Sequence, residues 1–427
     1  MKPDGWRSTT LKDVAPGESG LQTGPFGAQL HASDYTATGV PVVMPKDLDG
    51  GRINTRSIAR VPEAIAASLD RHRVRAGDIL FGRRGDIGRC GLVVEDERGW
   101  LCGTGCLRAR PDPRLADALF LVQLFTWETS VKWLTENAVG QTMLNLNTNI
   151  LGALPLCLPP LAEQRKIATI LSSVDDAIAA TQAVIDHLGV VKKAMMAELL
   201  TRGLPGRHTR FKHTEIGEVP EDWEVVPLDA VAVVQTGIAK GKAVERGVEL
   251  PYLRVANVQD GHVDLAEMKT ILVEETQVER YRLRVGDVLF TEGGDADKLG
   301  RGCVWHGQVD PCLHQNHVFA VRSNAARLLP QFLAYWAASP RGKEYFLDCA
   351  KQTTNLASIN STQLKAFPVP VVPSDEQVAI VALLSLADAR LEAERRESDG
   401  LQALKAALMS VLLTGEVRVT PDDEAAA

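Results

Sequence analysis

The sequence has no run of about 18 consecutive apolar residues, which argues against a membrane-spanning helix. The N-terminal segment MKPDGWRSTT also lacks an apolar h-region, so we expect no signal peptide and a cytoplasmic protein. With 427 residues, 45% of them hydrophobic, the chain is nevertheless long enough for two or more domains with separate cores.

Cysteine is scarce and poorly spaced for a structural role. An odd number of cysteines without C-x-x-C pairs argues against a disulfide framework or a zinc ribbon, and indicates small core residues. Cys102 and Cys106 lack the second half of a ligand set, so we predict no metal site. The seven positions are Cys90, Cys102, Cys106, Cys157, Cys303, Cys312 and Cys349.

Common catalytic signatures are also missing. The chain has no G-x-x-x-x-G-K-[ST], no G-x-S-x-G and no H-E-x-x-H, nor the [ND]-P-P-[YF] tetrapeptide of amino-methyltransferases. Glu267-Met268-Lys269, preceded by Asp260 and Asp264, has the E-x-K form of some nucleases, but such triplets are common by chance. A metal-dependent nuclease therefore stays only as an alternative, which predicts cleavage by the isolated chain with magnesium.

The formal net charge of −7 has the wrong sign for a protein that grips nucleic acid by neutralising phosphates. A nucleic-acid function would therefore require local basic patches or basic partner subunits.

The chain is an internal repeat. KPDGW (2–6) resembles VPEDW (219–223), LQTGPFG (21–27) resembles VQTGIAKG (234–241), and VRAGDILF (74–81) resembles LRVGDVLF (283–290). The offset stays between 209 and 217 residues, so insertions are small. Two similar units therefore follow one another.

Each half begins with alternating apolar residues and Gly or Pro turns, and then becomes helical. This pattern predicts two α+β globules, each closed by prolines and followed by a long helix. The predicted spans are 1–160 and 221–373 for the globules, 161–204 and 374–416 for the helices, 205–220 for a polar linker and 417–427 for a disordered tail.

Both long helices carry one narrow apolar stripe at alternating steps of three and four residues. Such a stripe over about five heptads favours pairing of the two helices as an antiparallel coiled coil, with a pseudo-two-fold axis, over packing on a globule. About 38 helical residues would span roughly 57 Å. The predicted seam is Ile167, Leu171, Val174, Ile178, Ile185, Leu188, Met195, Leu199, Ile380, Leu384, Leu391, Leu401, Leu408 and Leu412.

A glycine-rich loop follows the Gly-Asp strand in each half: GRRGDIGRCG (82–91) and GGDADKLGRG (293–302). Glycines let the backbone approach an anion, and Arg or Lys adds charge and base-edge donors, although such loops are often only solvated turns. Asn147 and Asn360 are more typical of turn caps than of base readers. The predicted DNA contacts are Arg83, Arg84, Arg89, Gln29, Lys240, Lys242, Lys298 and Arg301.

These features resemble the specificity subunit of type I restriction-modification systems. The resemblance is carried by GEVPEDWEVVPLDAV (217–231), both GD[IV]LF steps, LPLCLPPLAEQRKIATILSSVDDAI (154–178) and FPVPVVPSDEQVAIVALLSLADARL (367–391). It implies that each globule is a target recognition domain for half of a bipartite, asymmetric DNA site, and that the helices set the spacing. DYTATGVP (34–41) has a tyrosine that the second globule's ERGVELP (245–251) lacks, so the two half-sites should differ.

The resemblance also implies partners. Two adenine methyltransferase subunits would dock on the helices, and restriction subunits would join them. S-adenosylmethionine, ATP and Mg would be bound by those partners, so this chain would hold no cofactor and catalyse nothing. The predicted docking residues, on the helix faces away from the seam, are Arg165, Lys166, Asp176, Arg390 and Arg395.

Two other hypotheses remain open from the sequence. A related restriction enzyme that cuts on both sides of its site uses similar recognition subunits, and the sequence does not separate the two. A non-catalytic coiled-coil protein scaffold explains the helices and the acidic charge, but it leaves the repeated Gly and Arg loops unexplained.

Overall fold

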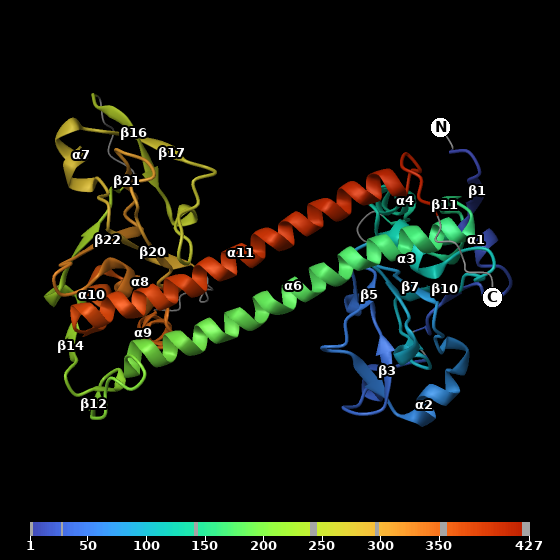
Figure 1. The fold of residues 1–427 in the computed structure, drawn as a ribbon, viewed down its shortest axis with the longest axis horizontal. Helices are drawn as coiled ribbons and strands as arrows, with labels where there is room; N and C mark the ends of the chain where they lie inside the picture. The colour runs from blue at the N-terminus through green and yellow to red at the C-terminus, as the bar shows by residue number, and fades with distance from the viewer. Residues whose placement is uncertain are drawn as a thin grey trace. The chain divides into compact units, whose positions relative to one another are not determined.

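The computed structural model describes residues 3–26, 29–140, 144–239, 246–294, 299–350 and 357–420. The chain divides into two compact units: unit 1 comprises 1–181 and 397–427, and unit 2 comprises 182–396. The two long helices, α6 (Leu161–Arg202) and α11 (Ser374–Leu412), each contribute one part to each unit (Figure 1). Two tandem α+β domains are confirmed, although each compact unit also includes helical segments that the predicted globule boundaries left out.

Unit 1 is built on a four-stranded antiparallel sheet in the order β2-β10-β7-β8. Its strands are β2 (Leu21–Thr23), β10 (Cys106–Ala109), β7 (Ile79–Gly82) and β8 (Cys90–Leu92). Helix α3 (Ala118–Thr126) packs on it, with the rings of Phe81 and Phe125 5.2 Å apart. The side chain of Asp117 begins α3 by accepting the N–H of Phe120.

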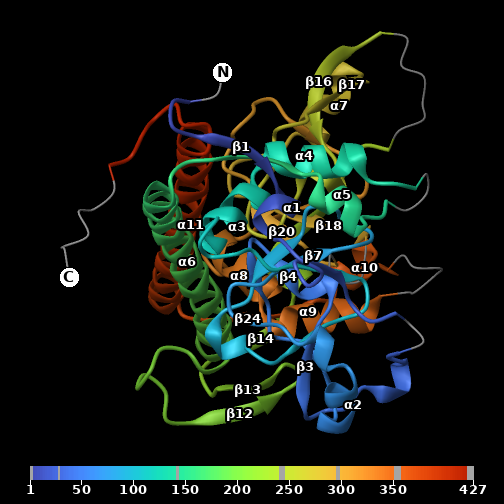
Figure 2. The same cartoon turned by 90° about the vertical axis from the view of Figure 1, so that its right-hand side faces the viewer.

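A smaller three-stranded sheet of unit 1 joins β6 (Ala59–Val61), β3 (Val40–Val43) and β9 (Leu101–Cys102), with β3 and β9 parallel. In both views of unit 1, β3 and α2 (Glu63–Ser68) lie away from α1 (Leu11–Val14) and α3 (Figures 1 and 2). The remaining elements are α4 (Glu128–Asn137), α5 (Thr148–Gly152), and the pairs β1 (Arg7–Thr10) with β11 (Pro155–Leu158) and β4 (Leu48–Asp49) with β5 (Arg52–Ile53).

Unit 2 repeats this plan. Its antiparallel sheet has the order β15-β22-β18-β20, formed by β15 (Ala232–Thr236), β22 (Val318–Ser323), β18 (Val288–Thr291) and β20 (Gly302–Val304). The smaller sheet joins β17 (Lys269–Val273), β16 (Val248–Leu253) and β21 (Leu313–His314), again with one parallel pair. The strand order therefore confirms the repeat read from the sequence.

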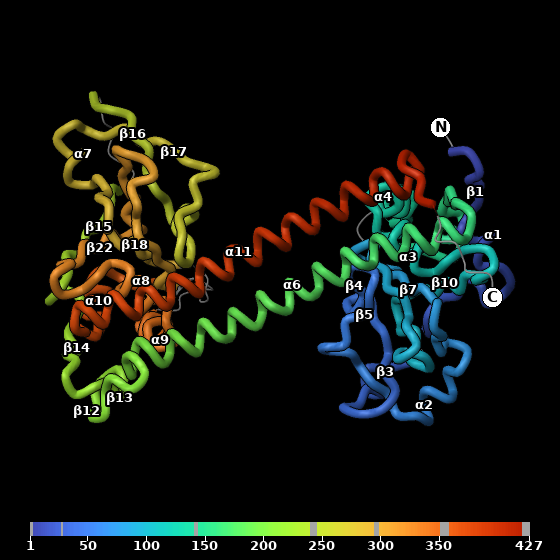
Figure 3. Tube along the Cα trace, viewed as in Figure 1, coloured from blue at the N-terminus to red at the C-terminus, as the bar shows by residue number. Residues whose placement is uncertain are grey.

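Helices α8 (Pro330–Ala338), α9 (Pro340–Cys349) and α10 (Ser361–Lys365) share one core with the first turns of α11 (Figure 3). Trp336, Phe346, Phe367 and Ile380 are all buried there. The other elements of unit 2 are α7 (Glu275–Tyr281), and the pairs β14 (Glu224–Pro227) with β24 (Pro368–Val371), β12 (Phe211–Thr214) with β13 (Gly217–Pro220), and β19 (Gly293–Gly294) with β23 (Ala357–Ser358).

The repeated Gly-Asp step has a structural cause. Gly77 and Gly286 have φ of 87° and 91°, a conformation that favours glycine. In unit 1 the buried Asp78 carboxylate accepts two 2.6 Å hydrogen bonds from the Arg110 guanidinium. Asp287 does the same with Arg322 in unit 2, at 2.8 and 2.7 Å. The motif therefore anchors the central strand of each sheet.

The predicted helix seam is buried or half-buried throughout. The buried positions are Ile167, Leu171, Val174, Leu199, Ile380, Leu384, Leu391 and Leu412, and the half-buried ones are Ile178, Ile185, Leu188, Met195, Leu401 and Leu408.

Ion pairs join α6 and α11 inside each unit. In unit 1 Lys405 Nζ lies 2.6 Å from Asp175 Oδ1, and in unit 2 Lys192 pairs with Asp388. Each aspartate also accepts a hydrogen bond from its own globule. Asp175 accepts one from Gln123 Nε2 at 2.6 Å in unit 1, and Asp388 accepts one from the Tyr335 hydroxyl at 2.7 Å in unit 2.

The Glu-Gln pair at the start of each long helix serves as an anchor. Gln164 Oε1 accepts the N–H of Asp117 and its Nε2 donates to Pro159, both at 2.9 Å. Gln377 makes the equivalent bonds to Leu329 and Val372. The glutamine thus fastens the first turn of its helix to the helical region of its own globule.

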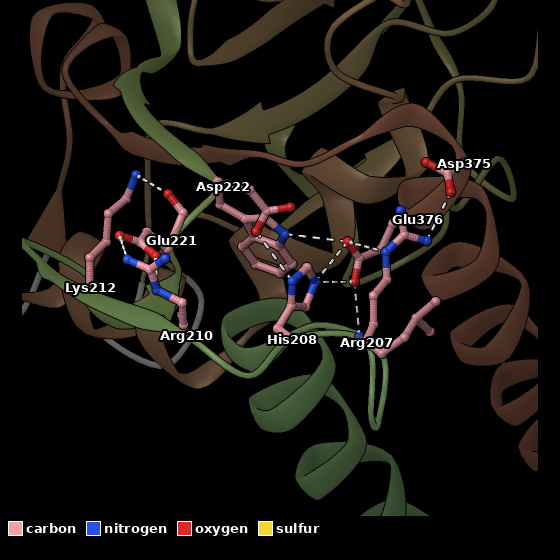
Figure 4. A network of polar contacts seen from close by, with 10 residues as sticks. Arg207, His208, Arg210, Lys212, Glu221, Asp222, Asp375 and Glu376 are labelled. Carbon is pink, nitrogen blue, oxygen red and sulfur yellow. Dashed lines mark hydrogen bonds and ion pairs between the residues drawn. The ribbon is translucent and has the colours of Figure 1, made fainter.

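The glutamates next to these glutamines, Glu163 on α6 and Glu376 on α11, each bind residues that follow the C-terminal end of the other long helix. In unit 1 the Arg418 guanidinium donates to both oxygens of Glu163, at 2.7 and 2.8 Å. In unit 2 the buried Glu376 is surrounded by Arg207, His208 and Trp223 (Figure 4).

The structure differs from the predicted spans at four places. Arg418 is held although 417–427 was expected to be disordered, and the predicted linker 205–220 contains the β12–β13 hairpin. The long helices end at Arg202 and Leu412, before the predicted ends at 204 and 416, because glycines with φ of 77° and 72° follow at Gly203 and Gly415.

Candidate nucleic-acid interface

The antiparallel strand order of unit 1 brings the ends of β2 and β7 and the starts of β8 and β10 to one edge of the sheet. Backbone hydrogen bonds tie the loops together there: the N–H of Arg83 donates to Gly105 at 2.7 Å, and the N–H of Leu146 donates to Arg83 at 2.9 Å. We call this edge the loop end of unit 1. It comprises residues 24–26, 29, 83–89, 103–105, 139–140 and 144–147.

All four DNA-contact candidates of unit 1 lie at this loop end. Arg84 and Gln29 are exposed, and Arg83 is half-buried with its Nε 3.2 Å from Asn145 Oδ1. Arg89 is exposed and pairs with Asp86 at 2.7 Å. Because Arg84 and Arg89 face solvent on a short, braced loop, their charges are available to a polyanion.

Glycine is required within the Arg-containing loop. Gly88 has φ of 105°, and a Cβ there would lie 2.6 Å from Val131 Cγ1. Gly85 has φ of 82°. The loop therefore folds back closely over α4, which holds Arg84 and Arg89 outward.

Unit 2 has the same framework at its loop end, which comprises residues 237–239, 292–294, 299–301, 315–317 and 357–360. The N–H of Glu292 donates to His317 at 2.9 Å, and the N–H of Ile359 donates to Glu292 at 2.7 Å. Of the predicted contacts here, Arg301 is half-buried and donates to Gln259 at 2.9 Å. Lys240, Lys242 and Lys298 lie outside the described residues.

Sequence reasoning missed three polar residues of these loop ends. Asn145 contacts Arg83 in unit 1, and Glu292 pairs with His317 in unit 2. None of them is part of the Arg and Gly motif: Glu292 directly precedes the second glycine-rich loop in the sequence, whereas Asn145 and His317 lie outside both loops. Asn147 and Asn360 are confirmed as caps: each side-chain oxygen accepts a backbone N–H at 2.9 Å, from Ile150 and Gln363.

The cysteines and Glu267, the other residues considered for a chemical role, make ordinary structural contacts. Burial raises the pKa of Cys90, Cys102, Cys303 and Cys312 to about 12, which disfavours a reactive thiolate. Glu267 is exposed and pairs with Arg254 and Lys269, at 3.4 and 3.6 Å. Within the described ranges, no three His, Cys, Asp or Glu side chains gather as metal ligands, and no helix is long and apolar enough to cross a membrane.

The predicted docking residues lie on the long helices as expected, and their role stays a prediction. Arg165, Arg390 and Arg395 are exposed and Lys166 is half-buried. Asp176 is exposed and pairs with Arg52 of its own globule at 2.6 Å, and Arg390 pairs with Glu394.

Comparison with known proteins gives concordant matches. The Type I restriction modification DNA specificity domain matches residues 3–188 and again 220–402. The chain is 30% identical over 210 residues to the putative type I restriction enzyme MjaX specificity subunit of Methanocaldococcus jannaschii, a match that spans 49% of each chain and so about half of that relative. It is 28% identical to the MjaVIII specificity subunit of the same organism, over 81% of this chain and 77% of that protein.

The fold has a solved counterpart. A chain from a structural study of complex assembly and conformational transition of the type I R-M system superposes with a TM-score of 0.58 at 19% identity, covering 98% of this chain and 100% of that one. Two matched specificity domains account for most of the sequence and coincide with the structural repeat. The chain therefore belongs to the family of type I restriction-modification DNA specificity subunits.

Proposed function

We propose that the chain is the non-catalytic DNA-recognition subunit of a type I restriction-modification complex, and that each loop end reads one half of a bipartite DNA site. The observation that carries this proposal is the recurrence of one backbone framework at both loop ends. Arg83 and Glu292 donate and accept the same pair of backbone hydrogen bonds in units 1 and 2. A fold that repeats its framework and varies its exposed side chains suits the reading of two different short sequences.

The half-sites should differ, because the loop ends do. Unit 1 presents Arg83, Arg84 and Arg89, whereas the corresponding part of unit 2 carries Glu292 and His317. Arginine offers paired donors that suit guanine, while a carboxylate accepts hydrogen bonds only. A single asymmetric DNA sequence is therefore the expected target.

We infer that α6 and α11 pair along their length as an antiparallel coiled coil that sets the gap between the half-sites. The two helices have 42 and 39 residues, which at 1.5 Å per residue corresponds to about 60 Å. The ion pairs Lys405–Asp175 and Lys192–Asp388 are reciprocal, as antiparallel pairing requires. Adding or removing heptads would change the gap.

The outer faces of these helices support docking of partner subunits. In unit 2 large apolar side chains face solvent on α6 and on α11, including Val190 at 66% and Leu386 at 69% exposure. Val184, Val191 and Leu383 add to them. Exposed apolar stripes of this kind are typical of surfaces that another helix covers.

Two adenine methyltransferase subunits are the proposed partners of the two helices, and their proposed polar contacts are Arg165, Lys166, Asp176, Arg390 and Arg395. Restriction subunits would complete the complex. S-adenosylmethionine, ATP and Mg would be bound by the partners. Shared phosphate contacts would also offset the formal charge of −7 on this chain.

The test is co-expression with the neighbouring methyltransferase gene, followed by mapping of methylated adenines in host DNA. The proposal predicts methylation within one asymmetric motif that has two short halves and a fixed gap. A complex that forms but leaves adenines unmethylated, or methylates without a motif, would instead support a protein scaffold. Cleavage of DNA by the isolated chain with magnesium would contradict a non-catalytic role.

A further inference from the structure

Unit 2 carries a carboxylate at the position where unit 1 carries a guanidinium. Glu292 and Arg83 each follow the strand that begins with the Gly-Asp step, β18 and β7. Each donates its N–H to the residue just before the neighbouring strand and accepts an N–H from a buried aliphatic residue, Ile359 or Leu146. Equal backbone bonding makes the two positions equivalent, so the charge at that point is reversed between the units.

Glu292 is held in place and still reachable from solvent. Its carboxylate pairs with His317 Nδ1, and its side chain is 31% exposed. The Asn316 side-chain nitrogen lies 3.4 Å from His317 Nε2. A neutral imidazole with its proton on Nδ1 satisfies both contacts, because it donates to Glu292 and accepts from Asn316. The carboxylate is therefore oriented without requiring a charged histidine.

A carboxylate on a DNA-reading surface has few partners. Phosphates repel it, and the base edges that offer donors in the major groove are the exocyclic amines of cytosine and adenine. An arginine at the same place can contact either phosphate or guanine, so its presence alone does not distinguish backbone contact from base reading. Glu292 is therefore the more specific marker of base reading, because among the groups that DNA presents in the major groove only the base amines can donate a hydrogen bond to its carboxylate.

We propose that Glu292 is a base-reading residue of unit 2, which accepts a hydrogen bond from the exocyclic amine of cytosine or adenine, and that His317 is its positioning residue. This proposal rests on the proposed function of the loop ends. It means that the two units read opposite kinds of base edge at equivalent positions: donors from Arg83 in unit 1 and acceptors from Glu292 in unit 2.

The experiment uses the complex reconstituted with its methyltransferase and maps adenine methylation for wild type and variants. Glu292→Ala should reduce discrimination on the order of 10- to 100-fold at one base pair of one half-site, and leave the other half-site unchanged. Glu292→Gln keeps the side-chain volume but presents a donor as well as an acceptor. Discrimination at the same base pair should therefore fall, while the thermal unfolding of the protein stays unaltered. Glu344→Gln is the matched control, because Glu344 is exposed on α9 and pairs with Arg341 inside that helix.

His317 is tested by conservative rescue. His317→Asn retains a donor toward Glu292 and should keep the wild-type motif, whereas His317→Ala should relax the same base pair as Glu292→Ala. A merely structural ion pair would instead lower methylation at all positions alike in both variants.

The outcomes separate this proposal from the function on which it rests. An unchanged motif in Glu292→Ala overturns the base-reading role while the wild-type motif preserves the proposed function. If Glu292→Gln binds every DNA sequence more tightly by the same factor, the base-reading role is also overturned, because the carboxylate would then only repel phosphates. A wild-type complex without any bipartite motif overturns both.

Discussion

The buried carboxylate of Glu376 offers a sharp test of how unit 2 is held to its helices. It accepts hydrogen bonds from the Leu204 N–H at 3.0 Å, from His208 Nε2 at 2.9 Å and from Trp223 Nε1 at 3.3 Å, and Arg207 Nε lies 3.3 Å away. The carboxyl is fully buried. Every one of these neighbours presents a donor, which suits a carboxylate because an ionised carboxylate only accepts hydrogen bonds (Figure 4).

Replacing Glu376 by Gln should destabilise this region by about 3 kcal/mol, because a single amide oxygen must serve all of these donors and the amide N–H₂ faces them. The equivalent Glu163 in unit 1 pairs with Arg418, whose side chain is 44% exposed. In Glu163→Gln that guanidinium can turn to water, so the expected loss is only about 1 kcal/mol.

Hydrogen exchange measured by mass spectrometry is the appropriate assay, because a chain with two compact units need not unfold in one step. Protection should fall in peptides covering 203–223 for Glu376→Gln, and much less in peptides covering 3–14 for Glu163→Gln. Equal losses in the two variants, or a loss below about 1 kcal/mol for Glu376→Gln, would refute the reasoning from donor count and burial.

Three further predictions concern other parts of the chain. Arg84→Ala should cost about 1 to 3 kcal/mol of discrimination in one half-site, measured as binding of the complex to altered sites. A double-mutant cycle of Lys192→Met and Asp388→Asn should give a coupling of about 0.5 to 1 kcal/mol in the hydrogen-exchange protection of unit 2, because both side chains are partly exposed. Burial, with the Arg71 and Arg108 charges, lowers the pKa of His72 from its ordinary value of 6.5 to about 4. The folded chain thus keeps the imidazole ring neutral, so His72 does not lower the stability of the folded state above pH 6.5. Between pH 7.5 and pH 5 the unfolded chain takes up a proton that the folded chain does not. The free energy of unfolding should therefore fall by about 2 kcal/mol over that range.

Each of these has a contrary result. Uniform weakening of Arg84→Ala on all sequences, with a reduced salt dependence, would make Arg84 a phosphate contact. Additive effects in the Lys192 and Asp388 cycle would mean that the ion pair contributes nothing. His72→Gln should flatten the pH dependence of unit 1, and an unchanged slope would assign that dependence to other groups.

Several features could be predicted from the sequence because they depend on local or periodic patterns. The repeat, the α+β globules and the helix stripe follow from residue spacing, and positions such as Ile167 and Ile380 are buried as that spacing requires. The caps at Asn147 and Asn360 were predictable for the same reason, since an N-cap involves only the next three residues.

The loop ends could be predicted only in part. The Arg cluster of 83–89 stands out as a motif, but Asn145 and Glu292 become site residues only through partners 62 and 25 positions away in the chain. Likewise the anchoring of Arg418 by Glu163 joins residues 255 positions apart. No local pattern in a single sequence encodes such pairs.

The sequence by itself determined that this protein is a tandem repeat of α+β domains with long striped helices, because periodicity and turn chemistry are properties of neighbouring residues. Only the tertiary structure decided which side chains share a surface. Strand order brings three separate loops to one edge of each sheet, and a fourth segment is joined to them by backbone hydrogen bonds. This shared bonding makes Arg83 and Glu292 equivalent despite their opposite charges. Contacts between residues distant in sequence therefore assemble the proposed recognition surface, which the local patterns leave undefined.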